Sequence, residues 1–453
     1  MKNASNPGRS HTTRVLCAVA ASAALALVSA CGSDTPSGDA TGGATGGATG
    51  GNAAKGPSGT ITYAGNTVQV GATIDVGDRL IEMFEAAYPD IKVERVEVPN
   101  DTDTIRSTLT TEISAGAGPD VYSGDMIWPA QFAAAGLAAP LSDYLSDDYF
   151  DTFAPGLIEG ATYQGKVYSA PWYTDNGHLF YRADLLEKHG LEVPKTWDEL
   201  IEASNTIVAA GDAKYGYVFQ AASYEGGTCS FVELLADTKA KVLNDAGDAS
   251  SLDSAEGVAA LELMKKLVDS GASPAAVSTF QESEATNLFA GGEAVFMRNW
   301  GGLWGTVQDE ESSKVVGKVG IAPMPGVDGI GYSSTGGWGL YLNPNSENVD
   351  AAIAFIEFVT STEAQLMTAT EFAMIPTVTS ARNDPAAAEN NPVMAVAPDV
   401  KFISRPANTP VYPAVSEALY TNMNAAMTGS VTPADAIKAA SQQIDTALSG
   451  AGL

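Results

Sequence analysis

The chain is poor in histidine and cysteine, on which many enzymatic and metal sites depend. Its 453 residues include three of each. His178 and His189 stand 11 residues apart without the HExxH spacing of a zinc-binding helix, and His11 lies near the start of the chain. The sequence also lacks a GxSxG elbow and a Walker-type phosphate loop. We therefore expect a protein that is not an enzyme and that has no metal and no cofactor.

Basic residues are also scarce. The chain has 24 Lys and Arg against 54 Asp and Glu, so its net charge is −30 at pH 7. Such a surface repels nucleic acids and anionic lipid headgroups. We expect no nucleic acid partner, and the ordinary explanation of the charge is the solubility of an exported protein.

The apolar run near the N-terminus is too short to span a membrane. Lys2, Arg9 and Arg14 precede the 14 small or apolar residues 15–28. As a helix these would cover roughly 21 Å, against about 30 Å for the hydrocarbon core. The layout predicts an export signal.

The residues after this run, Val28-Ser29-Ala30-Cys31, resemble the lipobox of bacterial lipoproteins. The resemblance implies that residues 1–30 are a signal peptide and that a lipid on Cys31 anchors the chain to the outer face of the cytoplasmic membrane. An ordinary signal peptide with an incidental cysteine is the alternative. Residues 31–58, which contain TGGATGGATGG, would be a flexible tether with a reach of roughly 30 Å. With Cys17 removed, Cys229 would remain as the one free thiol, which leaves no intrachain disulfide.

From Gly59 onward, short β-like runs alternate with helical patterns, which predicts an α/β fold. Thr196 and Glu199 have capping-box spacing. Residues 244–253 have the acids but not the spacing of a calcium loop, so we expect a turn there. Strands are expected at residues 60–64 and 91–98, and helices at 78–88, 196–210, 254–268, 351–359 and 433–448. Without a long linker between two halves, two compact domains are expected to share the chain by crossing several times.

Tryptophans gather in segments that also contain Gly, Pro and acids. Trp197 lies at a helix start and is expected to pack in the core. The other five are expected at strand or helix ends, where ligand sites of α/β folds form: Trp128, Trp172, Trp300, Trp304 and Trp338. An aromatic face beside carboxylates suits a sugar, because the sugar ring has apolar C–H patches and an edge of hydroxyl donors. Any single one of these rings is equally well a core aromatic, but the set favours a carbohydrate cleft.

At these segments the chain resembles the extracellular solute-binding proteins of carbohydrate ABC importers, and within them the trehalose/maltose-binding subgroup. The similarity runs from about Thr60 to the C-terminus in consecutive order. It is carried by GPDVYSGDMIWPAQFAAAGLAAPL (118–141), GKVYSAPWYTDNGHLFYRADLLEKHG (165–190), PKTWDEL (194–200), YEGGTCSFVE (224–233), FMRNWGGLWG (296–305), GKVGIAPMPG (317–326), TGGWGLYLNP (335–344) and RPANTPVYPAVSEAL (405–419).

The resemblance implies a two-domain periplasmic-binding-protein-like fold, with a hinge and a ligand cleft between the domains. Its three crossings would divide the chain into an N-terminal domain of residues 59–173 plus 340–374 and a C-terminal domain of residues 176–334 plus 378–453. It further implies a monomer that captures a small α-glucoside such as trehalose or maltose by hinge closure. The protein would then deliver this sugar to the membrane subunits of an ABC permease.

Ligand-contacting residues follow from the resemblance position by position. They are Asp75, Arg106, Asp125, Tyr173, Asp175, Glu225, Trp300, Gly337, Trp338, Arg405 and Tyr412. In one place the chain departs from the subgroup, which often has NWPYAW where this chain has Asn299-Trp300-Gly301-Gly302-Leu303-Trp304. The aromatic contact missing at Gly302 leaves room for a larger or differently linked sugar.

Two alternatives to a sugar receptor remain open from the residues. A lipid-anchored carbohydrate hydrolase would use Asp125 and Asp175 as its pair of acids, at a separation that the sequence does not provide. A receptor for another polar solute, such as a polyol, a glycerol glycoside or an amino acid, would use the same kind of cleft.

Overall fold

The computed structural model describes residues 56–65, 74–98, 101–389 and 391–451. The export signal, Cys31 and nearly all of the tether lie outside these residues, so those expectations stay predictions. The first strand begins at Gly59, where the folded part was expected to start. The described residues form one compact unit.

The first part of the chain alternates strands and helices and ends in a long strand. Its elements are β1 (Gly59–Ala64), α1 (Val76–Ala87), β2 (Ile91–Val96), α2 (Thr102–Ser114), β3 (Val121–Asp125), α3 (Pro129–Ala134), η1 (Leu141–Asp143), α4 (Asp147–Phe150), α5 (Leu157–Gly160), β4 (Thr162–Tyr163), β5 (Lys166–Val167) and β6 (Ala170–Arg182).

The middle part carries most of the second half of the sheet. Its elements are α6 (Ala183–His189), α7 (Trp197–Ala209), β7 (Tyr215–Val218), α8 (Glu225–Asp237), α9 (Ala255–Asp269), η2 (Ala275–Thr279), α10 (Glu282–Ala290), β8 (Ala294–Trp300), η3 (Gly301–Leu303), α11 (Trp304–Val307), β9 (Val319–Ala322) and β10 (Tyr332–Leu342).

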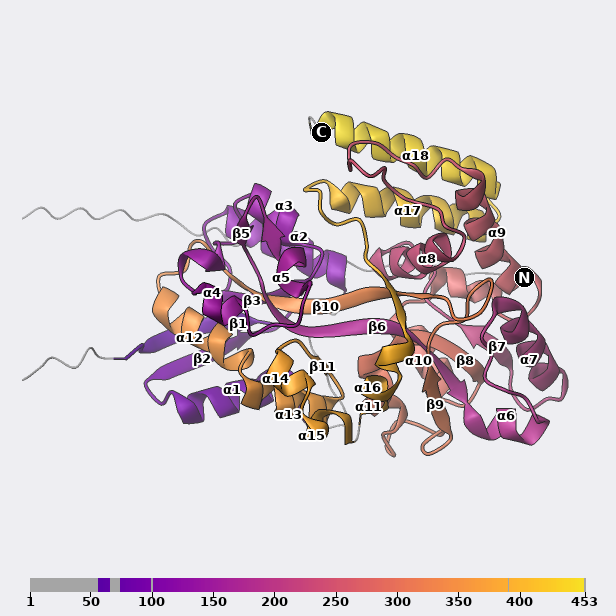
Figure 1. The fold of residues 1–453 in the computed structure, drawn as a ribbon, viewed down its shortest axis with the longest axis horizontal. Helices are drawn as coiled ribbons and strands as arrows, with labels where there is room; N and C mark the ends of the chain where they lie inside the picture. Colours follow the sequence, from indigo (N-terminus) through magenta and orange to yellow (C-terminus); the bar gives the residue numbers. More distant parts are fainter. Residues whose placement is uncertain (1–55, 66–73, 99–100, 390, 452–453) are drawn as a thin grey trace, which may run out of the picture. The chain divides into compact units, whose positions relative to one another are not determined.

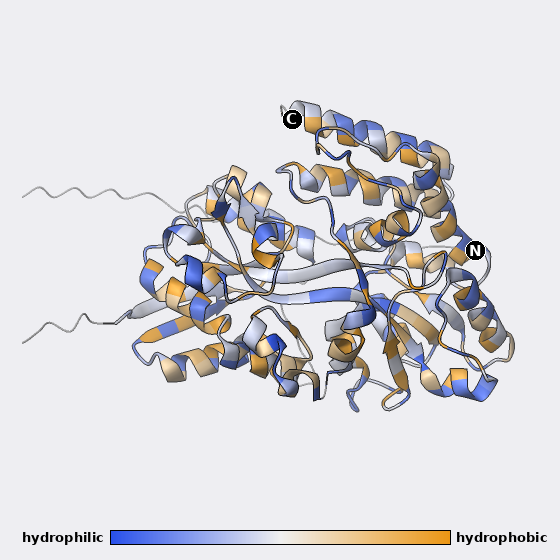
Figure 2. Cartoon of the chain, in the orientation of Figure 1, coloured by the Kyte–Doolittle hydropathy of each residue, from blue (hydrophilic) through white to orange (hydrophobic). Residues whose placement is uncertain are grey.

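The last part is mainly helical. Its elements are α12 (Val349–Val359), α13 (Thr362–Phe372), β11 (Ile375–Pro376), α14 (Thr379–Arg382), α15 (Pro385–Glu389), α16 (Pro392–Val396), η4 (Ala397–Asp399), β12 (Lys401–Ile403), α17 (Tyr412–Met427) and α18 (Pro433–Gly450). Hydrophobic and hydrophilic residues alternate along α17 and α18 (Figure 2), as in helices that cover a core on one face.

Two long strands join the two halves of the sheet. The strand order is β2-β1-β3-β10-β6-β8-β7, and β6 and β10 lie antiparallel at its centre (Figure 1). The first portion of β6 pairs with β10, and its last portion pairs with β8 and β9. The short β11 pairs with β6 at Tyr173 and Thr174. Three chain segments therefore lie next to one another where the three crossings were expected, although the exact domain bounds stay predictions.

The buried side chains form two clusters. One is built from residues 61–173 and 340–378, around Phe84, Trp172 and Phe355. The other is centred on residues 179–448 and also takes in apolar side chains of α2 and α3, such as Ile105 and Phe132. The strand β6 contributes Trp172 to the first cluster and Leu179 to the second, so it runs from one cluster to the other.

Local signals predicted several helices well. Thr196 and Glu199 form the expected capping box of α7, and Thr432 caps α18 ahead of Pro433. Ser254 caps α9 after the expected turn, in which the Asn244 amide N–H bonds the Ala249 carbonyl. The first helix begins at Val76 and not at residue 78, because Asp75 accepts a bond from the Gly77 amide and caps it.

The expected places of the tryptophans were partly wrong. Trp172 lies inside β6 and is fully buried, and Trp338 lies in the middle of β10. Trp128 precedes α3 and is buried as well, while Trp197 packs in the core as expected. The sequence did not predict that β6 and β10 would be so long. Both strands contain glycine, and glycine-containing segments were expected to lie at the ends of strands.

Candidate functional site

Arg405 lies between two carboxylates that come from distant parts of the chain. Its Nη2 and Nη1 donate to Asp125 Oδ1 and Oδ2 at 2.8 and 3.1 Å, and Nη1 also donates to Glu225 Oε1 at 2.8 Å. Asp125 ends β3, Glu225 begins α8, and all three side chains are buried. The two-point contact connects the end of β3 to the segment between β12 (Lys401–Ile403) and α17 by a charge-assisted pair.

Both carboxylate oxygens of Glu225 accept hydrogen bonds from side chains of one helix. The Tyr412 hydroxyl donates to Oε1 at 2.6 Å, and the Ser416 hydroxyl donates to Oε2 at 2.5 Å. Tyr412 and Ser416 are four residues apart at the start of α17, so they share one helix face. Burial raises the pKa of the Glu225 carboxyl, and the charge of Arg405 acts in the opposite direction.

Asp175 ties the crossing strand β6 to the loop after β8. Its Oδ1 accepts from the backbone N–H groups of Asn176 and Gly301, both at 2.8 Å, and Oδ2 accepts from the Gly302 N–H at 3.3 Å. Burial raises the pKa of Asp175 to about 6, although these three bonds favour its charged form. A Cβ on Gly302 would lie 3.2 Å from Asp175 Oδ2, with no other atom within 4 Å, so a side chain there would project into open space.

Trp300 and Trp338 are both half-buried and come from different strands. The Trp300 Nε1–H donates to Glu282 Oε1 at 3.1 Å, and the Arg298 guanidinium carbon lies 4.3 Å from the ring centre. The Trp338 ring meets the buried Trp128 ring edge to face at a centroid distance of 5.7 Å. Each ring is held by neighbours and keeps some exposed surface.

Gly337 permits the close approach of β10 to β6 beside these rings. Its φ is +131°, and a Cβ there would collide with the Tyr173 carbonyl oxygen. Tyr173 faces Trp338 across the strand pair. The glycine therefore has a structural role next to two predicted contact residues.

A small cavity lies beside Trp338. It has a volume of about 20 Å³ and is lined by Met126, Pro129, Leu157, Gly160, Ala161, Ser169, Pro171, Tyr173, Thr174, Trp338 and Gly339. This is room for about one water molecule. The cavity beside Trp338 is therefore too small for a sugar ring.

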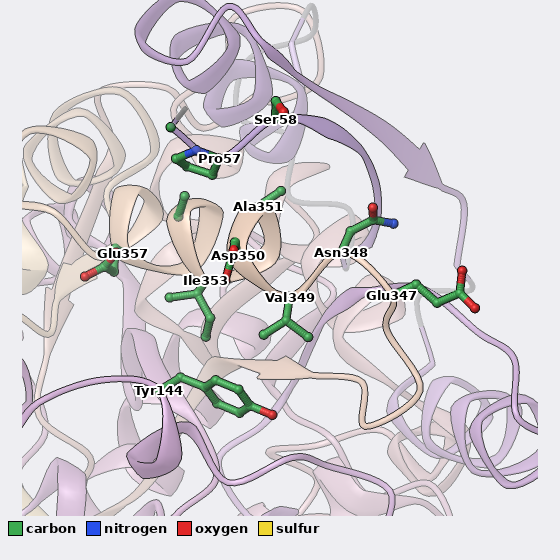
Figure 3. Close-up of a pocket in the computed structure, with 12 residues that line it drawn as sticks. Pro57, Ser58, Tyr144, Glu347, Asn348, Val349, Asp350, Ala351, Ile353 and Glu357 are labelled. Atoms are coloured by element: carbon green, nitrogen blue, oxygen red, sulfur yellow. The ribbon is translucent and has the colours of Figure 1, made fainter. Parts of the chain in front are cut away.

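A larger cavity of about 690 Å³ lies elsewhere, along α12 (Figure 3). Pro57, at the start of the described chain, and Tyr144 lie on opposite sides of this helix in the view, and Asp350 and Glu357 add acidic groups. None of the predicted contact residues lines it. Volume alone therefore does not indicate the functional site.

Two further predicted residues, Arg106 and Asp75, form ion pairs of their own. Arg106, on α2, pairs with Asp103 at 3.1 Å, and the charges of both act on the phenol of Tyr420 in α17. Burial raises the pKa of Tyr420 to about 12. Asp75 pairs with Arg95 and caps α1, so the structure gives this acid a role in folding. Direct ligand contact by any of the predicted residues stays a prediction.

Sequence reasoning missed Ser416, Tyr420 and Glu282. Ser416 and Tyr420 follow Tyr412 at helical spacing, so a helix prediction from residue 412 would have placed all three on one face. Glu282 starts α10, where Gln281 and Glu284 form a capping box, but its link to Trp300 has no local signal.

The described residues contain no group of three or more His, Cys, Asp or Glu that could hold a metal ion. Cys229 is a free, buried thiol in α8, and burial raises its pKa to about 12. Within the described ranges, none of the helices combines the length and apolar composition of a membrane crossing.

Sheet topology and site together define a two-domain α/β protein, with buried charges and half-exposed aromatics where the domains meet. The family model of bacterial extracellular solute-binding proteins matches residues 65–366. A curated relative from Deinococcus radiodurans, a probable ABC transporter-binding protein, is 31% identical over 364 residues, which are 78% of this chain and 86% of the relative.

Two solved structures extend this comparison. Maltose-bound MalE3 of T. maritima is 37% identical, with a TM-score of 0.80 over 85% of this chain and 99% of that one. The GacH receptor of Streptomyces glaucescens, solved unliganded and with acarbose, is 27% identical, with a TM-score of 0.78 over 86% of this chain and 99% of that one. This chain belongs to the family of bacterial extracellular solute-binding proteins and has their two-domain fold.

Proposed function

We propose that this protein binds a small α-glucoside such as maltose or trehalose and delivers it to the permease of an ABC importer. The observation that carries the proposal is the Arg405 network, which joins Asp125 to Glu225, with the half-buried Trp338 paired to Asp125 across the neighbouring strands. The 37% identity to a protein solved with maltose supports the same ligand class.

The chemistry of this network suits a sugar. Carboxylates only accept hydrogen bonds, and sugar hydroxyls donate them. Arg405 donates to both acids in the described structure, and a sugar hydroxyl would take over part of this bonding. Indole faces complement the apolar C–H patches of a pyranose ring. Bonds to charged groups contribute about 1.5–3 kcal/mol each where water is excluded.

Calorimetry with purified residues 56–453 tests this function. We expect maltose or trehalose to bind with one site per chain, and mannitol, ribitol and amino acids to give no heat of binding. Binding of a polyol alone would replace the proposed ligand class. A protein that binds no mono- to trisaccharide would contradict the proposal.

A hydrolase using Asp125 and Asp175 is less well supported. Asp125 accepts from Arg405, and both oxygens of Asp175 accept from backbone N–H groups, so each of the two acids already has donors that a catalytic acid or nucleophile would have to give up. Multiple-turnover cleavage of maltotriose by the purified protein would nevertheless establish such an activity.

We propose that the protein acts as a monomer held at the membrane by a lipid on Cys31. The lipobox-like segment and the roughly 30 Å reach of the tether support this arrangement. In cells expressing the full chain, we expect palmitate labelling that Cys31→Ser abolishes, with release of the protein into the medium. Unchanged labelling in the variant would contradict the anchor.

A further inference from the structure

Glu282 bonds two aromatic side chains at once. It is the first residue of α10, and its Oε1 accepts from the Trp300 Nε1–H at 3.1 Å. Its Oε2 accepts from the Tyr224 hydroxyl at 2.8 Å. Each of its oxygens thus has a separate donor from a different element.

The faces of the Trp300 ring are constrained without Glu282. The Arg298 guanidinium lies over the ring, and a Cβ on Gly336 would lie 2.8 Å from the ring carbon Cζ3. Arg298 is itself buried and donates to Glu233 at 2.7 Å and to Ser334 at 3.0 Å. These contacts lie against the carbon atoms of the ring, and the bond to Glu282 fixes the direction in which its N–H points.

The second bond reaches the charged network. Tyr224 is the residue directly before Glu225, and it is buried. A Cβ on Gly226 would collide with the Tyr224 hydroxyl and would lie 2.8 Å from Glu282 Oε1. The first turn of α8 is therefore shaped around Glu282, and the same turn presents Glu225 to Arg405.

We infer that Glu282 is a positioning residue for ligand binding, which holds the Trp300 ring and the start of α8 in one fixed arrangement. The inference rests on the proposed function, in which Trp300 and Glu225 face the same sugar. Holding both groups in place before the ligand arrives reduces the conformational entropy lost on binding. Glu282 acts through its two partners and need not touch the sugar.

Glu282→Gln tests this role with little change in size. A glutamine side chain has one oxygen and one NH2 group in place of two acceptor oxygens, so one of the two donors loses its acceptor or, in the case of the Tyr224 hydroxyl, must turn round to accept from the NH2 group. Both contacts also lose the charge that strengthens them. By calorimetry with maltose, we expect the Kd to rise about tenfold, with the thermal midpoint close to that of the wild type. Glu284→Gln is the matched control, since Glu284 lies on the same helix and accepts from the Gln281 amide instead. Its maltose Kd should be unchanged.

A double-mutant cycle separates positioning from a general structural effect. In a Trp300→Ala background, Glu282→Gln should raise the Kd clearly less than tenfold, because only the share of its effect that passes through Tyr224 remains. A full tenfold effect in that background would overturn the inference, as would an unchanged Kd in the single variant.

A second pair of variants covers the case in which Glu282→Gln does not fold. Trp300→Phe removes the indole N–H but keeps an aromatic face, and Tyr224→Phe removes only the hydroxyl. Each should weaken maltose binding several-fold, and unchanged affinity in both would overturn the inference. If the wild-type protein did not bind maltose, both the proposed function and this inference would fail. If the wild type bound maltose and the substitutions at Glu282 left the Kd unchanged, only this inference would fail.

Discussion

The guanidinium of Arg405 joins the carboxylate of Asp125 by two hydrogen bonds, of 2.8 and 3.1 Å, between residues 280 positions apart. Both side chains are buried, so water screens the pair weakly. The pair fastens the end of β3 to the segment before α17. Its strength therefore contributes to the stability of the fold.

Arg405→Met should lower the free energy of unfolding by about 3–5 kcal/mol, because it leaves Asp125 and Glu225 as buried acids without their cation. Urea denaturation at pH 7 measures this change. Asp125→Asn in the same background should restore part of the loss, since it removes one of the two unpaired charges. Losses that simply add in the double variant would show that the residues are not coupled.

Trp300→Ala should weaken maltose binding at least tenfold, because it removes an aromatic face at the proposed site. Calorimetry provides the Kd. Trp197→Phe is the control: Trp197 is buried and donates to Asp237 at 2.9 Å, so this change should lower the thermal midpoint and leave affinity unchanged. If Trp300→Ala lowered only stability, its ring would be a core aromatic.

Gly337→Ala should destabilise the protein by about 1–3 kcal/mol, since the residue has a φ of +131° and no room for a Cβ. We also expect weaker maltose binding, because Trp338 and Tyr173 flank the contact. Gly160 is the control, because it lines the small cavity beside Trp338 and a Cβ there would meet nothing within 4 Å. Gly160→Ala should therefore fold with wild-type stability. Chemical denaturation of the two variants compares them, and equal stability would contradict the steric argument.

His178 should make the protein less stable in mild acid. Its Nδ1–H donates to the Asn176 carbonyl at 2.8 Å, and Nε2 is buried with no hydrogen-bond partner among the described residues. Burial lowers the pKa of His178 to about 4, and the nearby charge of Arg298 acts in the same direction.

Between about pH 6.5 and pH 4, His178 is therefore protonated in the unfolded chain and neutral in the folded chain. The contribution of His178 is complete above pH 6.5 and is lost as the pH falls through this window, by about 3 kcal/mol at most. Urea denaturation at pH 7 and pH 5 should show a smaller loss for His178→Gln than for the wild type. Parallel losses would exclude His178 as the cause.

Local chemistry made much of the fold predictable. The Thr196 capping box and the Thr432-Pro433 start depend on atoms three or four residues apart, so sequence spacing suffices to predict them. The lengths of β6 and β10 were not predictable in this way. Both strands pass through glycine-containing stretches that only pairing on both sides keeps extended.

The candidate site was predictable in part. The resemblance to carbohydrate-binding proteins pointed to Asp125, Glu225, Arg405 and Tyr412, and the structure brings these four together. It did not indicate that Asp75 caps a helix, nor that Glu282 bonds Trp300. A carboxylate has no sequence pattern that reveals which distant donor it meets.

By itself, the sequence determined the α/β class, the helix starts and the family, because these depend on short-range spacing and on ordered motifs along the chain. Only the tertiary structure decided which charges pair, which tryptophans are buried, and that Arg405 holds two acids, one at the end of β3 and one at the start of α8. The reason is physical: an ion pair between residues 280 positions apart forms only when the packed core brings its strands and helices together, and burial then sets its strength.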